Sequence, residues 1–120
     1  MGVSTIRVAS DRQHGRTTLL LDVALANARR GAFVVFWSPS MPQARAAASR
    51  VLDLIESDDQ VVKISRANGN EEVRYSSGGR VKFAAGSPYV DPTRYSADVD
   101  VVDSEIVGAV HRHHGYEVRR

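Results

Sequence analysis

An uninterrupted apolar run over residues 32–37, with the sequence AFVVFW, constrains the fold of this chain more than any other feature. After its first alanine the run consists of β-branched and aromatic residues, a pattern typical of a strand that is covered on both faces. Strands of this kind occur mainly in parallel sheets, where helices cover the sheet. We therefore expect an α/β protein built around this strand.

The segments around this run alternate between helical and extended patterns. A Leu- and Ala-rich helix is expected over 17–30, followed by Gly31 as a C-terminal cap, and a second helix over 41–57, with Ser40 as its N-cap. The other expected elements are a strand over 4–10, a polar loop over 11–15, strands over 60–65, 72–76, 80–84 and 98–103, a loop over 86–96 and a short helix over 105–114.

This order of elements predicts a three-layer α/β sandwich with a mostly parallel sheet. The strands on either side of Ser77-Gly78-Gly79 have the signature of a β-hairpin, which we expect at the edge of that sheet. The whole chain, residues 1–120, is expected to form a single compact domain.

Composition excludes several classes of protein. Of the 120 residues, 42% are hydrophobic and 25% are charged, which is ordinary for a globular domain. The absence of cysteine excludes disulfides and thiolate chemistry. No apolar run approaches the ~20 residues of a membrane span, and the first residues lack the features of a signal peptide, so we expect no membrane partner and a cytoplasmic location. The net charge of +2 does not by itself indicate a nucleic-acid-binding protein.

The first candidate site, SDRQHGRT over residues 10–17, lies between the first expected strand and the first expected helix. A phosphate-binding loop needs this position, because the start of the helix offers N–H groups to an anion. It also needs a glycine that permits close approach, a cation for the phosphates and a hydroxyl for Mg²⁺. Gly15, Arg16 and Thr17 supply these parts, although a polar turn with a glycine explains the same residues without a ligand.

The second candidate site is the end of the apolar segment VDVVD over residues 99–103. In P-loop proteins an acid at the end of such a strand binds the Mg²⁺ of the nucleotide. An Asp that caps the following helix is the alternative explanation for Asp103. Because the two motifs occur in the expected order, we expect the Gly15 turn and Asp103 to lie side by side, on neighbouring parallel strands.

Together these segments resemble the ATPase domain of phage large terminase subunits, the DNA-packaging motors among the P-loop NTPases. The resemblance spans about residues 6–105 and rests on RQHGRTT over 12–18, VVFWSPS over 34–40 with QAR over 43–45, NGNE over 68–71, SGGRVKF over 77–83 and the acidic strand over 98–103. It implies a phage-type protein that binds ATP and Mg²⁺ in the host cytoplasm and is linked to DNA packaging or DNA handling. The implied nucleotide ligands are Arg12, Gln13, Gly15, Arg16, Thr17 and Thr18, the implied metal ligands are Thr17 and Asp103, and the implied catalytic acids are Asp103 and Glu105.

The chain departs from the family's pattern at positions that matter for hydrolysis. Arg16 stands where the family has lysine, and it keeps the charge on a bulkier, forked group. Ser104 stands where the family's catalytic glutamate follows the aspartate, and Glu105 comes one place later, about 100° away at a helix start. Asp100 is an alternative acid on a different face of its strand. Residues 106–120 are too few for the further strands and nuclease domain of the family. We therefore expect nucleotide binding with weak or absent hydrolysis.

Two weaker features complete the candidates. Arg74, Arg80 and Lys82 alternate with apolar residues along the expected hairpin, which predicts one basic face that contacts a nucleic-acid backbone or is simply solvated. His111 and His114 lie three residues apart in the expected last helix. They form a candidate metal pair, although a solvated basic helix end explains them better.

Two further hypotheses keep the fold without the nucleotide. In the first, the chain is a non-catalytic DNA- or protein-binding accessory module or a homo-oligomeric building block. The departures at Arg16 and Ser104 favour it, as does Ser10, which stands where the standard phosphate-binding loop has glycine. In the second, it is a regulator that mimics one subunit of a packaging motor and binds a phage or host protein. A rise in melting temperature with Mg-ATP would separate both from the nucleotide-binding hypothesis.

Overall fold

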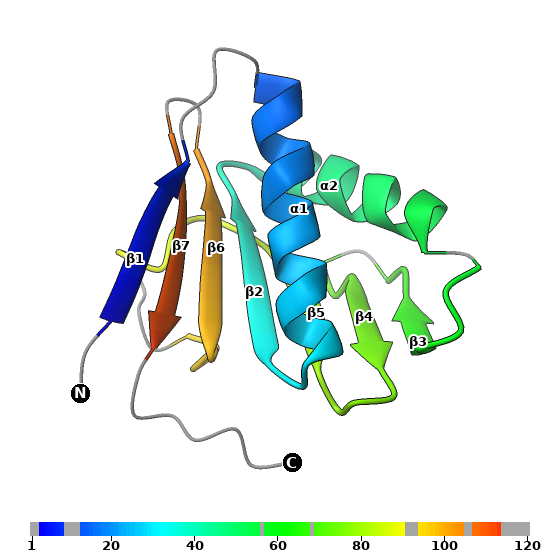
Figure 1. Cartoon of the computed structure of the whole chain (residues 1–120). Helices are drawn as coiled ribbons and strands as arrows, with labels where there is room; N and C mark the ends of the chain where they lie inside the picture. Colours follow the sequence, from blue (N-terminus) through cyan, green and yellow to red (C-terminus); the bar gives the residue numbers. More distant parts are fainter. Residues whose placement is uncertain are drawn as a thin grey trace.

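A seven-stranded mixed sheet dominates the computed structural model, which describes residues 3–8, 13–55, 57–67, 69–90, 94–104 and 107–113. The elements in chain order are β1 (Val3–Val8), α1 (Gln13–Arg29), β2 (Phe33–Ser38), α2 (Met41–Leu54), β3 (Val61–Ser65), β4 (Glu72–Tyr75), β5 (Arg80–Ala85), β6 (Val99–Asp103) and β7 (Gly108–His113). Across the sheet the strands lie in the order β1-β7-β6-β2-β5-β4-β3 (Figure 1).

The three central strands form the parallel part of the sheet. β2 pairs in parallel with β5 on one side and with β6 on the other, so that Val34 lies between Val81 and Val99. The other four pairings are antiparallel, and the expected mostly parallel sheet is therefore wrong. The physical reason is the length of the connections. A parallel return needs a crossover of a dozen or more residues, whereas only short segments join β3 to β4, β4 to β5 and β6 to β7.

The β4–β5 hairpin forms around Ser77-Gly78-Gly79 as expected, but its expected place at the edge of the sheet is wrong. β5 pairs with β2 in the interior of the sheet, and β3 pairs with β4 to form the edge.

The expected helix over 105–114 is also wrong, because residues 108–113 form β7 between β6 and β1. Gly108 lets β7 approach α1 closely, since a Cβ there would lie 2.6 Å from a methyl carbon of Leu20.

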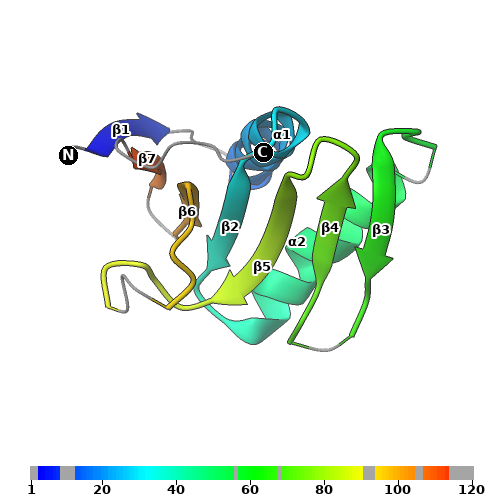
Figure 2. The same ribbon diagram turned by 90° about the horizontal axis from the view of Figure 1, so that it is seen from below.

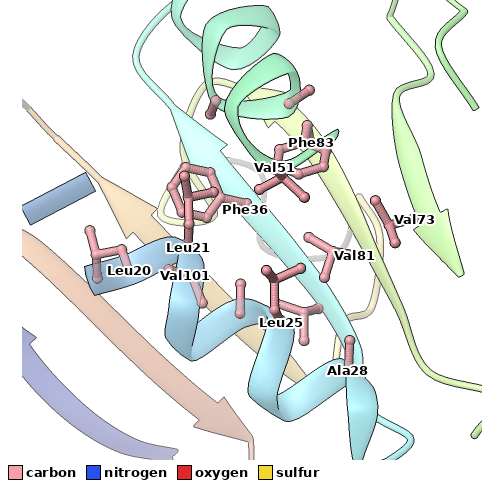
Figure 3. Close-up of a cluster of buried hydrophobic side chains, with 14 of the residues drawn as sticks. Leu20, Leu21, Leu25, Ala28, Phe36, Val51, Val73, Val81, Phe83 and Val101 are labelled. Carbon is pink, nitrogen blue, oxygen red and sulfur yellow. The ribbon is translucent and has the colours of Figure 1, made fainter. Parts of the chain in front are cut away.

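Both helices pack on the same face of the sheet, so the described elements form two layers and the expected three-layer sandwich is wrong. Their side chains join one core cluster that Figure 3 shows, with the labelled residues Leu20, Leu21, Leu25 and Ala28 of α1, Val51 of α2, and Phe36, Val73, Val81, Phe83 and Val101 of the strands. Burial of each large apolar side chain contributes about 1.5–3 kcal/mol, so this cluster is the main source of stability. The second helix begins as predicted, because the hydroxyl oxygen of Ser40 accepts a hydrogen bond from the backbone N–H of Gln43.

The opposite face of the sheet carries a smaller apolar cluster. It consists of Val35, Trp37, Ala84, Ala97, Val102 and Ala109, with Phe33 and Tyr95 at its margin. Tyr95 and Ala97 belong to the segment that joins β5 to β6, and Figure 2 shows this segment and α1 on opposite sides of β2 and β6. An apolar strand over 33–37 is thus covered on both faces as predicted, but a loop replaces the expected helical layer on one of them.

Within the described ranges, neither helix has the length and apolar character that a membrane crossing requires.

The turn between β4 and β5 packs against the end of α1 with no space for a side chain at Gly79. A Cβ at Gly79 would lie 1.8 Å from the carbonyl oxygen of Ala28, which also accepts a hydrogen bond from the Ser77 hydroxyl at 2.9 Å. We expect Gly79→Ala to lower the free energy of unfolding by about 3 kcal/mol, because helix backbone would have to move. Urea unfolding measures this loss.

Gly69→Ala is the matched control for this substitution. Gly69 has a φ of +81° and nothing within 4 Å of an added Cβ, so its replacement meets backbone strain alone and costs about 1–2 kcal/mol. A loss at Gly79 no larger than the loss at Gly69 would contradict the packing of this turn on α1.

Candidate functional site

The carboxyl ends of the three parallel strands meet at one edge of the sheet, where α1 also begins (Figure 1). β2 ends at Ser38, β5 at Ala85 and β6 at Asp103. In open α/β sheets, ligands bind in the crevice outside the carboxyl ends of the strands. This edge is therefore the first place to look for a site.

Asp103 forms the centre of this edge, where it joins β6 to the beginning of α1. Its Oδ2 accepts a hydrogen bond from Thr17 Oγ1 at 2.6 Å, and its Oδ1 accepts one from Arg16 Nε at 3.4 Å. Arg16 also donates from Nη2 to the carbonyl oxygen of Ser104. The Arg16 side chain is 2% exposed and that of Asp103 11%, so the ion pair is shielded from water and its attraction is stronger than that of a surface pair.

The route by which these residues meet differs from the expected one. The prediction that the Gly15 turn and Asp103 lie on neighbouring parallel strands is wrong, because β7 lies between β1 and β6. β1 is antiparallel to β7, and β7 is antiparallel to β6. β1 and β6 consequently run in the same direction and end at the same edge, which brings the start of α1 to the end of β6.

The polar loop expected over 11–15 is wrong for its last three residues, because α1 already begins at Gln13. Gly15 is therefore an exposed residue of the first turns of α1 rather than part of a loop before the helix. Thr18 is exposed one residue beyond Thr17, and its hydroxyl accepts a hydrogen bond from Arg50 of α2. The predicted site residues Arg12 and Glu105 lie outside the described residues, as does the side chain of Gln13.

A cavity of about 280 Å³ opens beside Thr17 and Asp103, between α1 and α2. Its lining consists of Thr17, Ser38, Pro39, Gln43, Ala46, Ala47, Arg50 and Asp103. Two hydroxyls, an amide, a guanidinium and a carboxylate thus face one small space, an arrangement that suits a charged ligand. We call it the Asp103 cavity.

Ser38, Gln43 and Arg50 were not among the predicted site residues. Gln43 and Arg50 lie seven residues apart, so they share one face of α2 two turns from each other. The sequence does contain a signal for Gln43 and Arg50. They are polar residues at that spacing on a helix whose neighbouring face is rich in alanine. Ser38 carries a similar signal, because it is the polar residue that ends the apolar central strand.

A larger hollow of about 600 Å³ lies on the other side of Asp103, over the second apolar cluster. Trp37, Tyr89, Val90, Arg94 and Val102 line it together with Pro39, Ala85, Gly86, Ser87, Asp103 and Ser104. Asp103 and Pro39 line both spaces. The edge of the sheet therefore offers a small polar cavity and a larger, mainly apolar one, with Asp103 between them.

Thr17 and Asp103 present the ligand types that Mg²⁺ prefers. Mg²⁺ is a hard cation that proteins usually hold through one or two carboxylates, with waters and substrate phosphates completing its coordination. In the part of the chain that the structure describes, no three His, Cys, Asp or Glu side chains gather closely enough to hold an ion by themselves. A magnesium ion at Asp103 would therefore need oxygens from its ligand and from water.

The histidine-rich segment lies in β7, where alternate residues share a face. His113 Nε2 lies 2.7 Å from Asp100 Oδ2, and Asp100 Oδ1 accepts a hydrogen bond from Trp37 Nε1 at 2.8 Å. The ring of His111 contacts Thr5 Oγ1 at 2.9 Å and the Tyr89 hydroxyl. Asp100 thus serves a buried polar network, away from Thr17. His114 lies outside the described residues, so the expected metal pair stays a prediction.

The predicted basic residues of the hairpin share one face of the sheet. Arg74 lies directly opposite Arg80, and Lys82 lies opposite Glu72. These residues do not line the Asp103 cavity or the larger hollow beside it.

Comparison of the chain with protein-family models, with curated proteins and with solved structures gives no match. The resemblance to terminase ATPase domains therefore stays a prediction from the motifs.

The His111 network predicts a pH-dependent stability. Burial is the main cause of a lowered pKa at His111; Asp100 opposes the shift, while His113 and Arg7 add to it. Because the folded pKa lies below the ordinary 6.5, the unfolded chain takes up this proton first as the pH falls. The stabilisation is therefore complete above about pH 6.5 and is lost as the pH falls through the folded pKa.

We expect the melting temperature of the wild-type chain to fall between about pH 7 and pH 5, and to fall less in His111→Gln. Thermal unfolding followed by circular dichroism at each pH measures both curves. Parallel curves for the two proteins would contradict the role of His111.

Proposed function

We propose that the edge of the sheet around Asp103 binds the magnesium complex of a nucleoside triphosphate such as ATP. The observation that carries the proposal is the convergence of a hydroxyl, a carboxylate and a guanidinium, from Thr17, Asp103 and Arg50, on one cavity at the carboxyl ends of parallel strands. Thr17 and Asp103 are the residues that would hold the metal ion. The ion would supply positive charge for the phosphate oxygens.

The remaining residues of the Asp103 cavity suit the phosphates. Arg50 offers a forked cation that matches phosphate geometry, and Ser38 and Gln43 offer neutral donors. The larger hollow on the other side of Asp103 suits the nucleoside, because Trp37 and Tyr89 give it aromatic walls. Ligands of this class have one highly charged end and one flat, mainly apolar end, and the two spaces differ in the same way.

Efficient hydrolysis is not part of the proposal. Asp103 is the only carboxylate that lines either space among the described residues, and it already accepts hydrogen bonds from Arg16 and Thr17. A carboxylate that binds the metal does not also activate the attacking water, and a general base must lie within hydrogen-bond reach of the proton it takes. We infer nucleotide binding with weak or absent turnover.

A second candidate function is a non-catalytic module in which Arg16, Thr17 and Asp103 serve only to hold α1 against β6. The observation that favours it is the burial of Arg16, whose guanidinium contacts both Asp103 and the Ser104 carbonyl. In this case the edge needs no ligand, and the module would act through DNA or protein partners.

A thermal-shift experiment with Mg-ATP separates the two functions. A ligand that binds only the folded state stabilises it by mass action, by about 2.7 kcal/mol at a concentration of one hundred times its Kd. We expect millimolar Mg-ATP to raise the melting temperature by several degrees, and EDTA to remove most of the rise. Arg50→Gln should lose most of the shift, because Arg50 lines the Asp103 cavity.

Arg45→Gln is the matched control, since Arg45 is an exposed cation on the same helix as Arg50 and lines neither space. It should keep the full shift. No shift in the wild-type chain would contradict nucleotide binding and favour the non-catalytic module. Equal losses in Arg50→Gln and Arg45→Gln would place the nucleotide elsewhere.

A further inference from the structure

Four cations lie side by side on the sheet face that points away from the helices. Lys63 of β3 lies opposite Arg74 of β4, and Arg74 lies opposite Arg80 of β5, so three like charges follow one another across the strands. Lys82 stands two residues after Arg80 on the same face. Like charges at directly opposite positions destabilise a sheet, so folding alone does not explain this arrangement. We call these four residues the cationic face.

Glu72 is the only acid of β3, β4 and β5, and it does not neutralise the cationic face. Its carboxylate oxygens lie 3.5 Å from Arg74 Nε and 3.0 Å from Arg80 Nη1. One carboxylate thus holds two guanidiniums in position, while the side chains of Arg74 and Arg80 stay 48% and 36% exposed. The surface keeps an excess of positive charge, and its complement is an anionic partner.

Aromatic rings border these cations on the same face. The Arg80 guanidinium carbon lies 4.0 Å from the centre of the Phe33 ring. Arg94 and Lys82 lie 4.9 and 5.6 Å from the centre of the Tyr95 ring. Phe33 and Tyr95 are only partly buried. Proteins bind single-stranded nucleic acids with two components, cations and exposed aromatic rings. The cations contact the phosphates, and the rings stack on the bases.

The shape of the face distinguishes single strands from duplexes. Base readout in a duplex requires a helix or a two-stranded ribbon that enters a groove, and both described helices lie on the other side of the sheet. A broad sheet surface with aromatic side chains instead suits splayed, unpaired bases. We propose that the cationic face, with Phe33 and Tyr95, binds single-stranded nucleic acid. None of the four cations lines the Asp103 cavity, so this proposal does not depend on nucleotide binding.

Fluorescence anisotropy with the full chain and a labelled oligothymidylate of about 20 nucleotides tests the proposal, since one domain covers ~4–16 nucleotides. We expect binding that weakens with salt, with a slope of log K against log salt of about −0.7 per contacted phosphate, or about −3 for four cations. Arg74→Gln and Lys82→Gln should each weaken binding about 5- to 10-fold at low salt and reduce the slope by about 0.7.

Two further variants separate the components of the surface. Tyr95→Leu should weaken binding at every salt concentration and leave the slope unchanged, because it removes stacking but no charge. Arg45→Gln removes an exposed cation from α2, on the helical side, and should leave the affinity unchanged. The melting temperature of each variant, measured in parallel, shows that the chain is folded.

Several results would overturn the proposal. Equal effects of Arg74→Gln and Arg45→Gln would mean that the chain binds through its overall charge. Competition by a duplex as effective as that by the single strand would remove the preference for unpaired bases. Competition by polyglutamate at equal charge would identify the partner as an acidic protein instead of a nucleic acid.

Discussion

The buried ion pair between Arg16 and Asp103 is the interaction on which the carboxyl edge of the sheet and its proposed site depend. The guanidinium and the carboxylate are both buried at the edge of the sheet, which costs desolvation free energy. Hydrogen bonds with Thr17 and with the Ser104 carbonyl help to offset this cost. Removing one partner of a buried pair leaves the other uncompensated, at a cost of about 3–5 kcal/mol. Together with the Thr17–Asp103 hydrogen bond, the pair joins the start of α1 to the end of β6, where Thr17 and Asp103 line the Asp103 cavity.

The two-layer architecture gives the molecule two separate surfaces for ligands. With both helices on one face, the carboxyl edge holds the polar groups that converge on Asp103. The other face is covered only in part, by the segment that carries Tyr95 and Ala97, and it leaves the cations of β3, β4 and β5 accessible. The polar Asp103 cavity and the cationic face therefore lie on different surfaces, and variants of Arg50 and Arg74 can test them separately. The larger hollow proposed for the nucleoside lies on the same face as the cations and shares Arg94 with their border.

Local patterns in the sequence predicted most of the elements but not their arrangement. The strand over 33–38, the helix from Met41 and the hairpin around residues 77–79 follow from burial, capping and turn residues that act over a few positions. The three-layer sandwich was predicted wrongly because an apolar strand indicates that both its faces are covered, without indicating whether a helix or a loop covers them. β7 was predicted as a helix because its pairing with β1 and β6 is non-local. The contact of Thr17 with Asp103 is also non-local, but the order of the two motifs predicted it. No motif contains Arg50, so its place in the cavity was not predicted.

The most direct test of the account is the position of the metal ion. Mn²⁺ can replace Mg²⁺, and its unpaired electrons broaden the NMR signals of nearby amides in ¹⁵N-labelled protein. With ATP and a small amount of Mn²⁺, we predict strong broadening at Thr17, Ser38 and Asp103, and much weaker broadening at Val73 in β4. Unchanged signals at Asp103, or broadening centred on His111 in β7, would contradict a metal–phosphate site at the end of β6.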